Sequence, residues 1–185
     1  MIQRIQSFYL VLAVCAFALC FMFPVATFEA TGEGSETKVV SQLNLIPRAD
    51  AGESDMLRQV EMGESLVTMP QRGVVSMWPM AVLAAVAGLL SLFSIFLFKK
   101  RMVQVRVVAV AILLNVVYLF ILFIGPIDKF AEQVGRIGSM VQAEQVDTTY
   151  SVATWAAVAS LLLLYLAQRA IKRDEAKVRA ADRLR

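Results

Sequence analysis

The segment Met77–Phe98, MWPMAVLAAVAGLLSLFSIFLF, decides the class of this protein. It runs for 22 residues without a charged side chain and stops at Lys99-Lys100-Arg101. An α-helix rises about 1.5 Å per residue, so about 20 apolar residues cross the hydrocarbon core of a bilayer. The segment therefore predicts a membrane-spanning helix whose end is marked by basic residues.

Three further uncharged runs have a similar length: Ser7–Ala26 with 20 residues, Val107–Gly125 with 19, and Val152–Gln168 with 17. Hydrophobic residues make up 58% of the 185 residues, which is more than an ordinary soluble domain contains. Backbone groups in lipid must satisfy their own hydrogen bonds, so each run is expected to be a helix. We predict an all-α integral membrane protein with four transmembrane helices, at about 7–26, 77–98, 107–125 and 150–168. The first run is longer than the apolar core of a signal peptide, so we expect it to be retained as a helix.

The distribution of charge predicts the orientation. With four spans, both termini and the 99–106 loop share one side, which carries 12 Lys and Arg, whereas the outer loops 27–76 and 126–149 carry 6. Acidic residues run the other way, with 3 in the tail 169–185 and 12 in the outer loops. By the positive-inside rule both termini are cytoplasmic. The basic residues thus indicate topology, and no nucleic-acid partner is expected.

The outer loops carry weaker signals. In residues 38–47, KVVSQLNLIP, Leu43 and Leu45 alternate with polar residues before a proline, which predicts a short strand, and residues 64–70 are a second candidate. We expect a small β-hairpin, since the apolar content is thin for an independently stable domain. Residues 54–62 are either a helical turn or a flexible link. After Gly125-Pro126, a helix stop, apolar residues recur at steps of three and four, and this amphipathic segment is expected to lie on the outer membrane interface.

The sequence offers little catalytic chemistry. It has no histidine, and Cys15 and Cys20 lie about 140° apart around a helix, so they are not placed to share a metal ion. No phosphate-binding glycine loop or nucleophile motif is present. We therefore predict no enzyme, no cofactor and no metal, and we identify no small-molecule substrate.

Polar and small residues inside the spans suggest helix contacts. Asn115, near the middle of the third run, is expected to hydrogen-bond a neighbouring helix; a role in a transport pathway is the alternative. Small residues recur at four-residue spacing, which allows helices to approach closely, either within the bundle or against a separate membrane protein. The motifs are Ala84-x-x-x-Gly88, Ala87-x-x-x-Ser91, Ala153-x-x-x-Ala157 and Ala156-x-x-x-Ser160.

The charged tail, RAIKRDEAKVRAADRLR at 169–185, continues the fourth helix. Its opposite charges fall at helical spacings, as in Glu175 and Arg179. Together with MIQRIQSFYLVLA at the start and KKRMVQVR after the second run, the tail resembles an uncharacterised family of small four-helix membrane proteins of Bacteroidota, a class defined as a domain of unknown function. The resemblance spans the whole chain. It implies a bacterial cytoplasmic (inner) membrane location, and no known activity.

We therefore hypothesise a non-catalytic accessory or scaffold subunit of an inner-membrane or envelope assembly. Its partners would be the lipid bilayer and a membrane protein or a second copy of the chain. A small oligomeric transporter or channel with Asn115 in the pathway is the alternative. The candidate partner-contact residues are Ala84, Gly88, Ser91, Asn115, Ala153, Ala157, Asp174, Glu175, Arg179, Asp182 and Arg183.

Overall fold

The computed structural model describes residues 3–31, 37–46, 65–68, 76–140 and 145–183. These residues form two compact units, each assembled from segments distant in the sequence. The helical unit comprises Met1–Cys20, Val82–Leu119 and Trp155–Arg185, and the sheet unit comprises Phe21–Ala81 and Phe120–Thr154. The two segments that were predicted to be strands both belong to the sheet unit, which also includes residues from the second outer loop.

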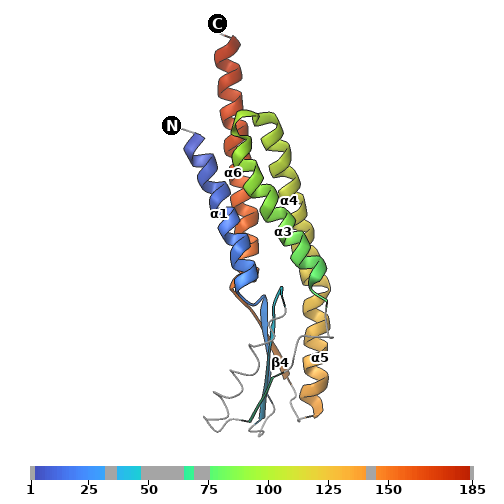
Figure 1. Cartoon of the computed structure of the whole chain (residues 1–185). Helices are drawn as coiled ribbons and strands as arrows, with labels where there is room; N and C mark the ends of the chain where they lie inside the picture. The colour runs from blue at the N-terminus through green and yellow to red at the C-terminus, as the bar shows by residue number, and fades with distance from the viewer. Residues whose placement is uncertain (1–2, 32–36, 47–64, 69–75, 141–144, 184–185) are drawn as a thin grey trace. The chain divides into compact units, whose positions relative to one another are not determined.

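Most of the described residues are helical (Figure 1). The helices are α1 (Gln3–Met22), α3 (Trp78–Phe96), α4 (Arg101–Ile124), α5 (Pro126–Met140) and α6 (Val152–Arg183), with a 3₁₀ turn, η1, at Leu97–Lys99. In the described part of the chain, three helical stretches are long and apolar enough to cross a membrane: Trp78–Phe96, Arg101–Arg136 and Val152–Val178. These helices indicate a multi-pass membrane protein. The apolar part of α1, Gln6–Met22, is shorter.

The interior of the helical unit is built from small and polar side chains as well as leucine and phenylalanine. Its apolar cluster joins residues of all four long helices: Leu10, Ala13, Phe17, Ala87, Val108, Ala111, Leu164, Ala167 and Ile171. Buried polar residues include Ser91, Gln104, Asn115 and Ser160. Many of the largest apolar side chains face outward instead, among them Phe8, Leu89, Phe93, Leu113 and Leu162. This distribution is expected of helices whose surroundings are apolar.

The sheet unit holds four strands in the order β3-β2-β1-β4. They are β1 (Ala26–Thr31), β2 (Thr37–Leu43), β3 (Ser65–Thr68) and β4 (Gln145–Tyr150). β1 pairs antiparallel with both β2 and β4, so Ala26 lies opposite Leu43 on one side and Tyr150 on the other. β2 and β3 pair in parallel, so these two segments do not form the β-hairpin that was expected from the sequence. The predicted strands at β2 and β3 are confirmed, and β1 and β4 were missed because they border the helices.

Helix α5 covers one face of this sheet (Figure 1). The Phe130 ring of α5 packs against Phe28 of β1, with ring centroids 5.1 Å apart. A Cβ atom on Gly135 would lie 3.4 Å from a methyl group of Val146 in β4, so the helix and the strand lie close together. The apolar face of this amphipathic segment, which was expected to lie on the membrane interface, is instead buried against the sheet.

Several helix ends differ from the apolar runs. α1 ends at Met22, four residues before the predicted boundary, because Pro24 disfavours helix and Ala26 enters the sheet. α4 begins at Arg101 and takes in most of the predicted 99–106 loop. Gln104 stabilises this turn, since its Nε2 donates to the carbonyl oxygen of Ser94 at 3.0 Å. Pro126 begins α5 after a single turn residue, Gly125, because proline fits the first position of a helix.

Candidate functional site at the α1–α6 contact

A buried polar contact joins α1 to the charged extension of α6. The Gln6 side chain donates from Nε2 to Oδ2 of Asp174, and the same nitrogen lies 3.4 Å from the carbonyl oxygen of Ala170. Gln6 and Asp174 are both 6% exposed. A buried carboxylate is costly unless it accepts hydrogen bonds, so this contact fixes the position of the tail on α1.

The contact lies at the end of two interlocking apolar stripes. Gln6 continues the buried face of α1 formed by Leu10, Ala13 and Phe17, at steps of four, three and four residues. Asp174 continues the buried face of α6 formed by Leu164, Ala167 and Ile171, at steps of three, four and three. Residues at these spacings share one helix face. The two polar residues therefore close the helix–helix interface where the apolar residues end.

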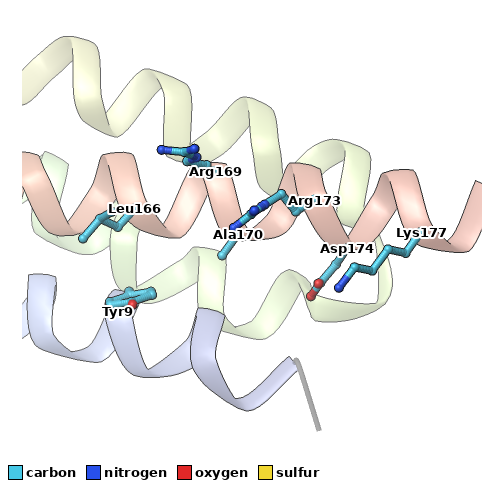
Figure 2. A pocket seen from close by; sticks show the side chains of 7 residues that line it. All are labelled: Tyr9, Leu166, Arg169, Ala170, Arg173, Asp174 and Lys177. Atoms are coloured by element: carbon cyan, nitrogen blue, oxygen red, sulfur yellow. The ribbon is translucent and has the colours of Figure 1, made fainter.

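A groove of about 570 Å³ lies beside this contact (Figure 2). Tyr9 of α1 lines it together with residues of α6: Leu166, Arg169, Ala170, Arg173, Asp174 and Lys177. Three of the seven lining residues are basic and one is acidic, which gives a lining charge of +2 (3 − 1). Figure 2 shows the side chains of Arg173 and Lys177 running back along α6 toward Ala170 and Asp174.

A second polar contact lies within the bundle. Asn115 Nδ2 donates to Ser160 Oγ at 2.7 Å and lies 3.4 Å from the carbonyl oxygen of Ala157. Ser160 Oγ in turn donates to the same carbonyl at 2.7 Å. Asn115 Oδ1 and the Tyr118 hydroxyl are buried, and neither has a hydrogen-bond partner among the described residues. Asn115 thus hydrogen-bonds a neighbouring helix, as the sequence predicted, and the structure shows that this neighbour is α6.

A family model described as "Domain of unknown function (DUF4293)" matches residues 2–184. The chain belongs to this family. This match confirms the prediction, made from the sequence, that the chain belongs to a family defined as a domain of unknown function. No curated protein matches the chain.

The small-residue positions of this DUF4293 chain are packed inside it. Ala84 is 1% exposed, and Ser91, Ala153 and Ala157 are fully buried. A Cβ atom on Gly88 would lie 3.3 Å from Cβ of Phe17, so this glycine lets α3 approach α1 closely. These side chains are used in contacts within the chain. A partner protein would therefore contact other residues.

The tail residues predicted as partner contacts divide into two groups. Asp174 is turned inward onto Gln6, whereas Glu175 is half-buried. The backbone of Arg179, Asp182 and Arg183 belongs to α6, but their side chains lie outside the described residues. The side chains of α6 that are described as exposed beyond the span are instead Arg169, Lys172, Arg173, Ala176, Lys177, Val178 and Ala180.

Sequence reasoning missed Gln6 and Tyr9 as site residues. The available signal was periodicity, because Gln6 and Asp174 each stand one helical step beyond a buried apolar stripe. The pairing of these two stripes could not be read from one sequence, since it depends on which helices are neighbours. Among the described residues, no three His, Cys, Asp or Glu side chains are grouped so that they could hold a metal ion.

Proposed function

We propose that all four long helices of the chain, including α1, cross the membrane. Leu10, Ala13 and Phe17 of α1 belong to the same apolar cluster as Ala87 of α3 and Ala111 of α4. On its other side α1 exposes Phe8, Val11, Leu12 and Leu19. A helix that packs among spanning helices and exposes large apolar side chains is best accommodated by lipid. The apolar stretch Gln6–Met22 has 17 residues and spans about 25 Å, close to the thickness of the hydrocarbon core.

We further propose a bacterial inner-membrane location with both termini in the cytoplasm. The support is the 12 basic residues on the terminal side, against 6 in the outer loops. Fusions at the C-terminus test this orientation: we expect green fluorescent protein to fluoresce there and alkaline phosphatase to be inactive. The opposite pattern would overturn the orientation.

Within this topology, the function that we propose is a non-catalytic accessory or scaffold subunit of an envelope assembly. The observation that carries the proposal is the Gln6–Asp174 contact. This contact holds the first turns of the tail against α1. The part of α6 beyond the span therefore starts from a fixed position and orientation on α1. Of the 32 residues of α6, about 20 suffice to span, which leaves about 18 Å of helix to contact a partner.

Site-specific crosslinking tests the scaffold proposal. A photoreactive residue placed at Ala176 or Ala180, both exposed, should yield an adduct with a defined membrane protein or with a second copy of the chain. The same residue at Ala167, which is fully buried, is the matched control and should yield no intermolecular adduct. Mass spectrometry identifies the partner, and a chain truncated after Arg169 should no longer recover it. A monomer without adducts at either exposed position would refute the proposal.

A transport pathway at Asn115 is the second candidate. The observation that favours it is the buried Asn115 Oδ1, which has no hydrogen-bond partner among the described residues. Solute flux into proteoliposomes that is abolished by Asn115→Leu, but not by Ser91→Ala, would support this candidate over the scaffold. Equal flux with and without the protein would exclude it for the solutes tested.

A further inference from the structure

The groove beside the Gln6–Asp174 contact changes character along α6. At its span side it is lined by Leu166 and the half-buried Tyr9, and farther along α6 the basic residues Arg169, Arg173 and Lys177 line it. Tyrosine is enriched at membrane–water interfaces, where its ring lies in the apolar region and its hydroxyl reaches water. Leu166 belongs to the uncharged run, and Arg169 is the first charged residue after it. The groove therefore extends across the boundary between apolar and charged residues.

The cations of the groove form a stripe. Arg169, Arg173 and Lys177 stand at i, i+4 and i+8 and thus share one face of α6. Successive members lie about 6 Å apart along the helix axis. The headgroup layer of one leaflet is about 5–8 Å thick. With Arg169 at the end of the span, both arginines therefore reach the level of the lipid phosphates, and Lys177 lies beyond it.

The acidic residue of the lining does not cancel the arginines. The Asp174 carboxylate accepts from Gln6 and is 6% exposed. Figure 2 shows the Lys177 side chain turned toward Asp174. The lining holds three cations against this one carboxylate, so it keeps a net positive charge of +2. Arginine binds phosphate with parallel N–H donors, which a lysine does not offer.

We propose that this groove binds the phosphodiester headgroup of an anionic phospholipid from the leaflet on the tail side. Arg169 and Arg173 bind the phosphate oxygens, while Leu166 and the Tyr9 ring contact the glycerol and the start of an acyl chain. This inference rests on the proposed membrane topology. It explains why the arginines follow one stripe that lines a groove, since a topology anchor requires only that positive charges be present.

Lipid binding to the purified full-length chain tests the proposal. Native mass spectrometry in mild detergent would count bound phosphatidylglycerol against phosphatidylcholine over a concentration series. We expect the intact chain to favour phosphatidylglycerol, and Arg169→Gln with Arg173→Gln to weaken that binding by roughly tenfold to thirtyfold. The matched control is Lys100→Gln with Lys172→Gln, which removes two exposed charges outside the groove and should change binding less than about twofold. Equal losses in the two double variants, or no preference between the lipids, would overturn the proposal.

Two further measurements make the result specific. Arg169→Lys with Arg173→Lys keeps the charge but loses the paired donors, so its affinity should fall between those of the intact chain and the Gln variant. Soluble glycerol phosphate supplies the phosphate without acyl chains and should compete poorly. If it binds as tightly as the lipid, the groove is a site for soluble phosphate instead. Lipid binding is measured on the purified chain without a partner protein, whereas the C-terminal fusions test the topology and the crosslinking tests the scaffold role. A failure of the lipid site is therefore distinguishable from a failure of the proposed function.

Discussion

The two units bury different kinds of side chains. On the strands and α5 of the sheet unit, the fully buried positions include Phe28, Leu43 and Phe130, whereas the outward strand positions Gln42, Asp147 and Thr149 are polar. In the helical unit, alanine, serine and asparagine are prominent in the interior, whereas phenylalanine and leucine are prominent on the surface. The strands and α5 thus follow the pattern of a protein interior formed in water, whereas the helical unit follows the pattern of helices packed in apolar surroundings.

The physical reason for this difference is the medium that surrounds each set of side chains. In water, burying a phenylalanine ring removes apolar surface from solvent, so large side chains stabilise the interior. In lipid, the surroundings are as apolar as leucine, and helices associate through close packing and interhelical hydrogen bonds instead. Gly88 against Phe17 and Asn115 with Ser160 are examples of these two contributions. Substitutions in each unit can sharpen or break this comparison.

The largest effect is expected from Phe130→Ala. It removes the ring that packs on Phe28 and should destabilise the sheet unit by about 3–5 kcal/mol. Hydrogen exchange followed by mass spectrometry should show faster exchange in β1 and β4. Phe93→Ala makes the same chemical change on the exposed surface of the helical unit and should cost less than about 0.5 kcal/mol. Similar losses in both variants would break the comparison.

A smaller loss is expected from Gly88→Leu. The added side chain would collide with Phe17 and separate α3 from α1, at a cost of about 1–3 kcal/mol. Unfolding in mixed micelles of mild detergent and sodium dodecyl sulfate measures the change. The control is Leu89→Ala, at the neighbouring exposed position, which should be nearly neutral. A neutral Gly88→Leu would show that close helix approach does not stabilise this unit.

The hydrogen bond between α4 and α6 should contribute less. A double-mutant cycle of Asn115→Leu and Ser160→Ala should give a coupling of about 0.6 kcal/mol, and at most about 1.7 kcal/mol, as is typical between membrane helices. The same mixed-micelle unfolding measures all four proteins of the cycle. A coupling of zero would mean that the contact seen between the two side chains does not stabilise the bundle.

The smallest effect concerns the face of the sheet opposite α5. Glu29 of β1 and Asp147 of β4 are directly opposite in the register, and like charges in such pairs are unfavourable. Asp147→Lys should stabilise the sheet unit by about 0.2–1 kcal/mol, with the gain shrinking as salt is added. Exchange rates of the β1 amides at low and high ionic strength test this. A loss of stability would show that Asp147 makes a favourable contact.

Much of the helical architecture could be predicted from the sequence, because uncharged runs of membrane length leave the backbone few alternatives. The runs at α3, α4 and α6 and the apolar segment of α1 are all helical. The same rule overextended α1 to Ala26, since apolar character does not distinguish the end of a membrane helix from a buried strand. For α5, the expectation of a position on the membrane interface came from the amphipathic periodicity of its apolar residues, and a sheet covers such a face equally well.

At the candidate site, the sequence by itself determined which residues could take part: a charged helical tail, an isolated asparagine and stripes of small residues. Only the tertiary structure decided which neighbours they meet. It turned Asp174 inward onto Gln6, 168 residues away in the sequence, and it left Arg169 and Arg173 to line a groove with Tyr9. The physical reason is that helix periodicity fixes which side chains share a face, whereas the neighbour of that face depends on packing between helices distant in the chain.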